Sequence, residues 1–306
     1  LNFKFVLLAL FGATMGQGVV WYTGQFYALS FLQKVANIEF EQSNYIIAAS
    51  LAGGTGFFIF FGWLSDKIGR KSVMLTGMLL AICTYRPIYQ AMYEAADVSL
   101  KTEVAGSKVI KTDYFMIPQS VDLKKTVKTE FSYTDGSTLT LEESSLTTIF
   151  PGKNPQKPEV KRIVHVGTSS FWYLILLVFI QVLYVTMVYG PIAAFLVEMF
   201  PTAIRYTSMS LPYHIGNGIF GGLLPAVATY LAAKASTANE VAVAAGQAIP
   251  YDKPYLEGLW YPIIIGGVCF VIGLLYVNGK DKEINELKER VLTLEKLVNK
   301  LIEQKH

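Results

Sequence analysis

Long runs of uncharged, apolar residues constrain this chain more than any other feature. Residues 45–64 contain no charged side chain, and neither do residues 72–85. About 20 residues, each rising about 1.5 Å along a helix, cross the hydrocarbon core of a bilayer, so such runs indicate membrane spans. We therefore predict an all-α polytopic membrane protein, surrounded by a lipid bilayer, with six transmembrane helices. The predicted spans are 3–32, 43–64, 72–92, 171–200, 206–233 and 259–277.

Composition agrees with a membrane protein and excludes other classes. Charged residues make up 16% of the 306 positions, against about 25% in soluble domains. The net charge of +3 is too small and too scattered to indicate a nucleic-acid partner. Cys83 and Cys269 both lie inside apolar runs, where a cysteine is usually a small packing residue. We expect no metal and no cofactor.

A short charged turn separates the second and third predicted spans. It contains Lys67, Arg70 and Lys71 against a single acid, Asp66, so the excess of basic residues places it in the cytoplasm. Gly62 and Gly69 are expected to permit the tight backbone path of the reversal. A soluble helix hairpin with a basic turn is the alternative interpretation.

The turn also resembles a known motif. Gly62, Leu64, Asp66, Gly69, Arg70 and Lys71 spell Gly-x-Leu-x-Asp-x-x-Gly-Arg-Lys, which is similar to the cytoplasmic signature loop of the major facilitator superfamily. In that family the loop connects helices 2 and 3 and recurs between helices 8 and 9. The motif indicates the superfamily and carries little information about substrate.

The order of motifs resembles one branch of that superfamily. Residues 16–27, the signature loop and the segment Glu-x-Phe-Pro-Thr-x-x-Arg-Tyr at 198–206 look like parts of helices 7 to 11 of metabolite:proton symporters. The resemblance implies a secondary active transporter for a small polar metabolite such as an organic acid or osmolyte, coupled to a proton. It also implies that the N-terminal repeat is missing. No carboxylate lies in the middle of a span, so proton coupling is inferred from the resemblance alone.

Two segments lie outside this resemblance. Residues 93–170 regain charges, and alternating residues flank Asp135-Gly136, which is typical of a β-hairpin. We expect a small β-rich insert with a structural role. The tail, 279–306, has apolar residues at heptad spacing, which favours a two-stranded coiled coil and a homodimer; a solvated helix is the alternative. The heptad residues are Ile284, Leu287, Val291, Leu294, Val298 and Leu301.

These segments divide the chain and fix an expected topology. The predicted domains are 1–92 with three spans, 93–170 as the insert, 171–278 with three more spans, and 279–306 as the tail. Counting spans from the cytoplasmic turn places the tail in the cytoplasm and the insert on the outer side of the membrane. The expected location is the inner (plasma) membrane of the cell.

The resemblance assigns roles to two groups of residues. The first is a conformational latch at the cytoplasmic rim, in which acids and bases exchange partners as the two repeats rock. The latch consists of Gly62, Asp66, Gly69 and Arg70 in the signature loop, with Glu198 and Arg205 as the corresponding pair between helices 10 and 11. An alternative is that these charges only set the orientation in the membrane.

The second group is expected to bind the small-molecule substrate, because helices 7 and 10 of the family line its cavity. Spacing puts Gln17, Trp21 and Gln25 on one helical face; bonding between neighbouring helices would be the structural alternative for these polar groups. The candidates are Gln17, Trp21, Tyr22 and Gln25 on the first span, Tyr184 and Tyr189 on the fourth, and Asn217 on the fifth.

Other functions are less compatible with the sequence. A membrane receptor or anchor, with the insert sensing outside and the coil dimerising inside, is the main alternative. An enzyme is disfavoured because no nucleophile, base and orienting group occur together in a motif. ATP-driven pumping is disfavoured because no G-x-x-x-x-G-K-[ST] loop occurs. Since residue 1 is not methionine, we expect the chain to be a piece of a longer protein.

Overall fold

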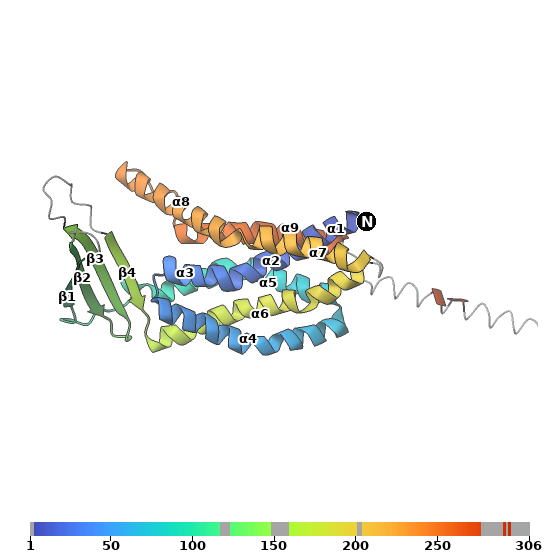
Figure 1. Ribbon diagram of the computed structural model, residues 1–306, viewed down its shortest axis with the longest axis horizontal. Helices are drawn as coiled ribbons and strands as arrows, with labels where there is room; N and C mark the ends of the chain where they lie inside the picture. The colour runs from blue at the N-terminus through green and yellow to red at the C-terminus, as the bar shows by residue number, and fades with distance from the viewer. Residues whose placement is uncertain are drawn as a thin grey trace, which may run out of the picture.

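The computed structural model describes residues 3–116, 123–147, 159–200 and 204–276, together with 290–291 and 293–294. A bundle of long helices makes up most of these residues, and an antiparallel sheet lies at one end of the bundle (Figure 1).

The first predicted span is a continuous helical rod that changes its winding twice. Its 32 residues run from Phe3 to Lys34. Two π-helical turns, η1 and η2, interrupt the α-helix in this span, which is rich in glycine and polar residues. The segments are α1 (Phe3–Ala9), η1 (Leu10–Thr14), α2 (Met15–Tyr22), η2 (Thr23–Tyr27) and α3 (Ala28–Lys34).

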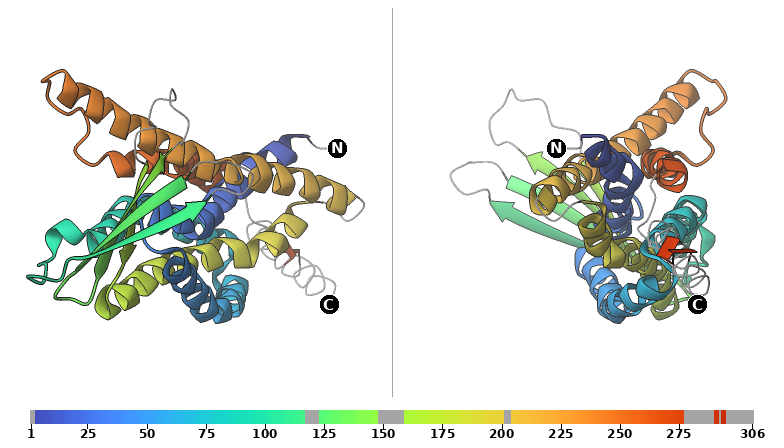
Figure 2. Two further views of the ribbon diagram at one scale, coloured as in Figure 1. Left: turned by 60° about the vertical axis from the view of Figure 1, so that its left-hand side comes forward. Right: turned by 90° about the vertical axis from the view of Figure 1, so that its right-hand side faces the viewer.

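Most of the other bundle helices correspond to predicted spans. They are α4 (Phe40–Ile68), α5 (Arg70–Ala96), α6 (Thr168–Met199), α7 (Arg205–Ile215), the π-helical η5 (Gly216–Gly221), α8 (Leu224–Ala244) and α9 (Trp260–Tyr276), with short 3-10 turns at η3 (Val98–Leu100) and η6 (Pro254–Leu259). The fifth predicted span ends at residue 233, but the helix α8 continues to Ala244. That extension is rich in alanine, the strongest helix former, and leans away from the bundle (Figure 2).

Within the described residues, five helical segments are long and apolar enough to cross a membrane. They cover the first, second, fourth, fifth and sixth predicted spans. The third predicted span is α5, a helix of 27 residues packed in the same bundle. Arg86 and the glutamate Glu94 make α5 more polar than the other five segments.

Turns and helix termini that are far apart in the sequence gather at the two ends of the helix bundle. The start of α1, the α4–α5 turn and the ends of α6 and α9 lie at one end of the bundle (Figure 1). The sheet, the end of α5 and the end of α8 lie at the other. This arrangement agrees with the parity used to predict the topology; the side of the membrane that each end faces stays a prediction.

The insert is a four-stranded antiparallel meander, in the order β1-β2-β3-β4. The hairpin expected at Asp135-Gly136 joins β2 to β3, and Gly136 has a φ of 80°, which glycine adopts without strain. The strands are β1 (Val109–Met116), β2 (Leu123–Ser132), β3 (Thr138–Thr147) and β4 (Glu159–His165).

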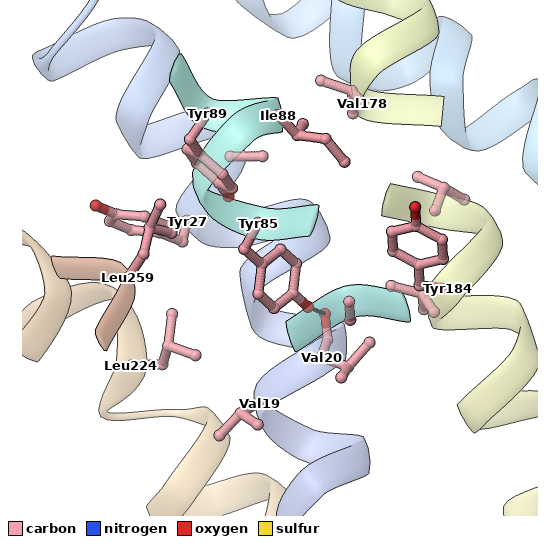
Figure 3. Close-up of a cluster of buried hydrophobic side chains, with 14 of the residues drawn as sticks. Val19, Val20, Tyr27, Tyr85, Ile88, Tyr89, Val178, Tyr184, Leu224 and Leu259 are labelled. Carbon is pink, nitrogen blue, oxygen red and sulfur yellow. Dashed lines mark hydrogen bonds between the residues drawn. The ribbon is translucent and has the colours of Figure 1, made fainter. Parts of the chain in front are cut away.

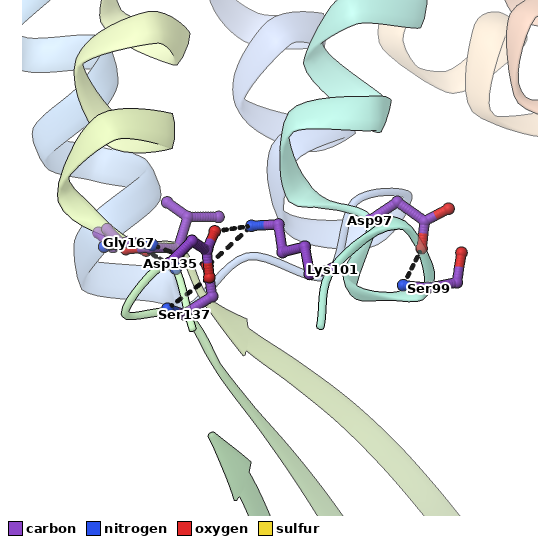
Figure 4. Close-up of polar contacts among 8 residues, drawn as sticks. Asp97, Ser99, Lys101, Asp135, Ser137 and Gly167 are labelled. Carbon is purple, nitrogen blue, oxygen red and sulfur yellow. Dashed lines mark hydrogen bonds and ion pairs between the residues drawn. The ribbon is translucent and has the colours of Figure 1, made fainter. Parts of the chain in front are cut away.

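Hydrogen bonds fasten this sheet to the bundle. Val164 N donates to Asn37 O over 2.7 Å, and Gln42 bonds both the N–H and the carbonyl of Val166 through its side-chain amide. In a second cluster, Lys101 Nζ lies 2.8 Å from Asp135 Oδ2 and 2.7 Å from Ser137 Oγ (Figure 4). The sheet is therefore held through the start of α4 and through the segment that follows α5.

A group of tyrosines fills the centre of the bundle on the side nearer the sheet. Tyr27, Tyr85 and Tyr89 are almost completely buried (Figure 3). Tyr89 Oη donates to Thr23 O over 2.7 Å. Tyr89 stands edge-on to Phe31. These rings join the first span to α5 and hold the helices beside the candidate site.

The coiled-coil prediction falls largely on residues that the structure does not describe. Ile284, Leu287, Val298 and Leu301 lie outside the described residues. Val291 and Leu294 are helical and exposed. The coil and the homodimer stay predictions.

Candidate functional site

Three predicted substrate residues of the first span, Gln17, Trp21 and Tyr22, lie on α2, which crosses η5 very closely, and Gln25 lies in η2. A Cβ atom added to Gly18 would lie 2.6 Å from the carbonyl oxygen of Gly216, and one added to Gly221 would lie 2.5 Å from the ring of Tyr22. Glycine at these three positions lets the two backbones touch. Gly218 does not take part in this close contact, since an added Cβ atom there would meet nothing within 4 Å.

Two amide side chains meet at this crossing. Asn217 Nδ2 donates to Gln17 Oε1 over 3.1 Å and to Tyr213 O over 3.0 Å. Both side chains are buried. Gln17 Nε2 and Asn217 Oδ1 have no hydrogen-bond partner among the described residues. The pair therefore bonds neighbouring helices, as the structural alternative expected, and still offers one donor and one acceptor.

An aromatic cluster covers the next turn of α2. Trp21 lies 5.2 Å from Tyr189 and 5.4 Å from Tyr22, measured between ring centroids. Trp21 Nε1 donates to Gln25 Oε1 over 2.8 Å, which confirms that these two residues share a face. Trp21, Tyr22, Gln25 and Tyr189 are all half-buried. A ligand could reach these rings, whereas Gln17 is covered.

The sequence analysis missed two members of this cluster. Tyr213 Oη lies 2.9 Å from Tyr189 Oη, and the ring of Phe58 stands edge-on to Tyr189 at 5.9 Å. Tyr213 precedes Asn217 by one helical turn, so the spacing could have indicated it. Nothing in the local sequence of α4 distinguishes Phe58 from the other phenylalanines around it.

Tyr184 does not join the cluster. Its hydroxyl accepts a hydrogen bond of 3.2 Å from Thr84 Oγ1, at the contact between α5 and α6. Tyr184 and Tyr189 are five positions apart on α6, so they point to different sides of the helix. Figure 3 shows Tyr184 on α6 facing the helix that carries Tyr85.

A solvent-open hollow of about 710 Å³ lies elsewhere, along the extension of α8. Tyr230, Lys234 and Val241 line it, and none of the predicted substrate residues does. Alanines supply much of its wall, so it offers few groups to orient a polar ligand. We therefore place the candidate site at the α2–η5 crossing.

The predicted latch residues form a charge cluster at the opposite end of the bundle from the sheet. Arg70 Nη2 lies 2.9 Å from Asp66 Oδ1, and Arg70 Nη1 pairs with Glu198 Oε1. Because these residues begin α5, end α4 and end α6, one guanidinium joins three helices. Arg205 does not pair with Glu198; its Nε donates to Phe200 O over 3.1 Å.

The backbone of the turn depends on one glycine rather than two. Gly69 is the sole residue between α4 and α5, and its φ of 93° lies in the left-handed region. Gly62 lies inside α4, so the expectation that it shapes the reversal is wrong. Lys71 Nζ donates to Leu274 O over 2.9 Å, near the end of α9. A cation there interacts favourably with the carbonyls of the helix terminus.

Comparison with known proteins gives a partial match. A curated protein of Haemophilus influenzae, named "Putative metabolite transport protein", is 35% identical to this chain over 117 residues. The match covers 38% of this chain and 21% of the length of that relative. No family model matches the chain, and no solved structure matches it. The likeness and the membrane-type helices support a transport protein in general.

Proposed function

We propose that the chain is the C-terminal six-helix half of a secondary active transporter of the major facilitator superfamily, in its metabolite:proton symporter branch. In this proposal a small polar metabolite binds at the aromatic cluster of Trp21, Tyr22, Tyr189 and Tyr213. A second six-helix unit would close the site from the other side. The transport relative and the long apolar helices support this proposal.

The position of Arg70 supports the proposal most strongly. It stands in the signature-like loop and bonds Asp66 and Glu198 on two other helices. A charge-assisted pair across three helices stabilises one arrangement of their ends. If the helices separate during transport, these bonds must break, so the cluster sets the balance between two states.

The candidate site favours a polar, largely uncharged contact surface. Gln25 bonds Trp21 within the aromatic cluster, the amides of Gln17 and Asn217 are buried at the adjoining crossing, and none of these side chains carries a charge. Such a site orients a ligand through hydrogen bonds and ring faces rather than through a counter-ion. The outer sheet is compatible with a receptor as well, and an uptake measurement separates the two functions.

The test is uptake into vesicles that contain the full-length protein, with a panel of labelled organic acids and osmolytes and an imposed pH gradient. We expect uptake of one class, and a loss of about tenfold or more in Trp21→Ala, since aromatic contacts that orient the ligand are removed. Trp172→Ala is the matched control, because Trp172 is exposed on α6. No uptake of any compound, or equal uptake by both variants, would contradict the proposal.

A further inference from the structure

The outermost strand of the sheet has an open edge. β1 is the first strand in the order β1-β2-β3-β4, and no described residue pairs with its outer side. It lies at the edge of the sheet farthest from the helices (Figure 1). Its eight residues present a row of about 26 Å along which every second residue leaves its N–H and carbonyl unpaired.

Apart from the charges of Lys111 and Asp113, this edge lacks the features that normally prevent association. Val109, Ile110, Tyr114, Phe115 and Met116 have exposed fractions of 47%, 58%, 59%, 59% and 76%. Natural proteins shorten such strands, place proline in them or cover them, because an open apolar edge pairs with other chains. β1 is long, contains no proline and is exposed at every position.

Two charges on β1 form no ion pair within the described sheet, although Glu142 and, less strongly, the nearby Asp113 raise the pKa of Lys128. Lys111 and Asp113 are two residues apart, so they lie on the same face of the strand. Lys111 stands opposite Lys128, a like charge that destabilises the pair, and Lys128 is already bonded to Glu142 over 2.8 Å. Neither Lys111 nor Asp113 forms an ion pair with a described residue. Their charges are therefore available to a strand on the open side.

We propose that β1 binds an extended segment of a water-soluble protein, which adds a fifth, antiparallel strand to the sheet. The bound segment carries an acid opposite Lys111 and a base opposite Asp113, with apolar residues on either side of them. Backbone hydrogen bonds along β1 provide the affinity, and the two charges fix the register. This role is separate from transport.

The alternative partner is a second copy of this chain. If the β1 strands of two copies paired antiparallel with Thr112 opposite Thr112, Lys111 of each copy would face Asp113 of the other. The charges of two β1 strands are therefore complementary. The two-fold axis of such an antiparallel pair is perpendicular to the sheet. The strands follow one another along the long axis of the bundle (Figure 1), so the two bundles would extend in opposite directions. Two copies in one bilayer cannot meet in this way, so we favour a partner from the aqueous phase.

Because the charges of β1 are complementary to those of a second β1 strand, a peptide with the β1 sequence can serve as a probe for the open edge. A labelled peptide with the sequence of β1, Val-Ile-Lys-Thr-Asp-Tyr-Phe-Met, is titrated onto the full chain in lipid nanodiscs, alongside a peptide in which Lys and Asp are exchanged. We expect the first peptide to bind about fivefold more tightly or better, because the exchanged peptide puts like charges opposite each other. The double variant Lys111→Asp with Asp113→Lys should reverse this preference.

Two controls make the result decisive. Glu159→Lys, on the opposite edge strand, should leave the preference unchanged. Equal binding of both peptides to the unaltered chain, or the same preference in the double variant, would overturn the proposal. Thr112→Cys tests the second copy: we expect no disulfide-linked dimer in vesicles, and efficient dimer formation there would replace the soluble partner by another copy.

Discussion

Asn217 Nδ2 donates to Gln17 Oε1 over 3.1 Å, although 200 positions separate the two residues in the chain. The bond forms where Gly18 and Gly216 allow α2 and η5 to touch. Each amide keeps one polar atom without a partner among the described residues. A buried amide pair with spare bonding capacity is therefore part of the contact between the first and fifth predicted spans.

The amide pair should show coupling in stability. Gln17→Leu and Asn217→Leu should each lower the free energy of unfolding by about 1–2 kcal/mol, because each leaves the other amide buried without its partner. The double variant should lose less than the sum of the two. Thermal unfolding in detergent measures this, with Gln247→Leu as an exposed control. Strictly additive losses would show that the bond contributes little.

Close packing at Gly18 should be sensitive to a single methyl group. Gly18→Ala should lower the free energy of unfolding by about 1–3 kcal/mol, because its Cβ would lie 2.6 Å from a backbone oxygen. Gly56→Ala is the matched control, since an added Cβ atom there would meet nothing within 4 Å. Gly218→Ala should be equally harmless. Similar melting temperatures for the Gly18 and Gly56 variants would show that the crossing is looser than described.

The charge cluster should control transport rather than insertion. Asp66→Asn and Glu198→Gln should each slow uptake about tenfold, because a charge-assisted bond to Arg70 is lost. Arg70→Ala combined with Glu198→Gln should be little worse than Arg70→Ala alone. Amounts of protein in the membrane should match those of Asp252→Asn, which alters an exposed loop. Unchanged uptake by Asp66→Asn in the full-length protein would refute the latch.

The junction between sheet and bundle should loosen in acid. Burial by itself would raise the pKa of the Asp135 carboxyl, but the Lys101 ammonium and the bonds from Ser137 outweigh it and hold the pKa below its ordinary value. A lowered pKa in the folded state stabilises the fold at pH values above the unfolded pKa of about 3.9, and this stabilisation is lost as the pH falls below that value.

Hydrogen exchange at the amide of Gly167, which donates to Ser137 Oγ, reports on this junction. We expect faster exchange below about pH 4, after correction for the intrinsic rate. In Asp135→Asn this acid dependence should be absent, while exchange at neutral pH should already be faster. An identical pH profile in both proteins would show that Asp135 is not the titrating group.

The sequence predicted much of the architecture and only part of the site. Apolar run length indicated the long helices, and Asp135-Gly136 indicated the hairpin. Trp21 and Gln25 could be placed on one face because their spacing matches a helical turn. Tyr184 could not be separated from Tyr189, since both lie in one apolar helix and only the packing of α6 against α5 and α2 distinguishes them.

What the sequence determined by itself is local: helix length, the turn at Gly69 and the alternation of the insert follow from residues within one or two helical turns of each other. The tertiary structure decided which side chains form hydrogen bonds and ion pairs with each other. Arg70 bonds Glu198 instead of leaving it to Arg205, and Asn217 finds Gln17, because bundle packing brings together groups that are far apart in the chain. Hydrogen bonds and ion pairs act over a few ångströms, so a linear pattern cannot assign them across such separations.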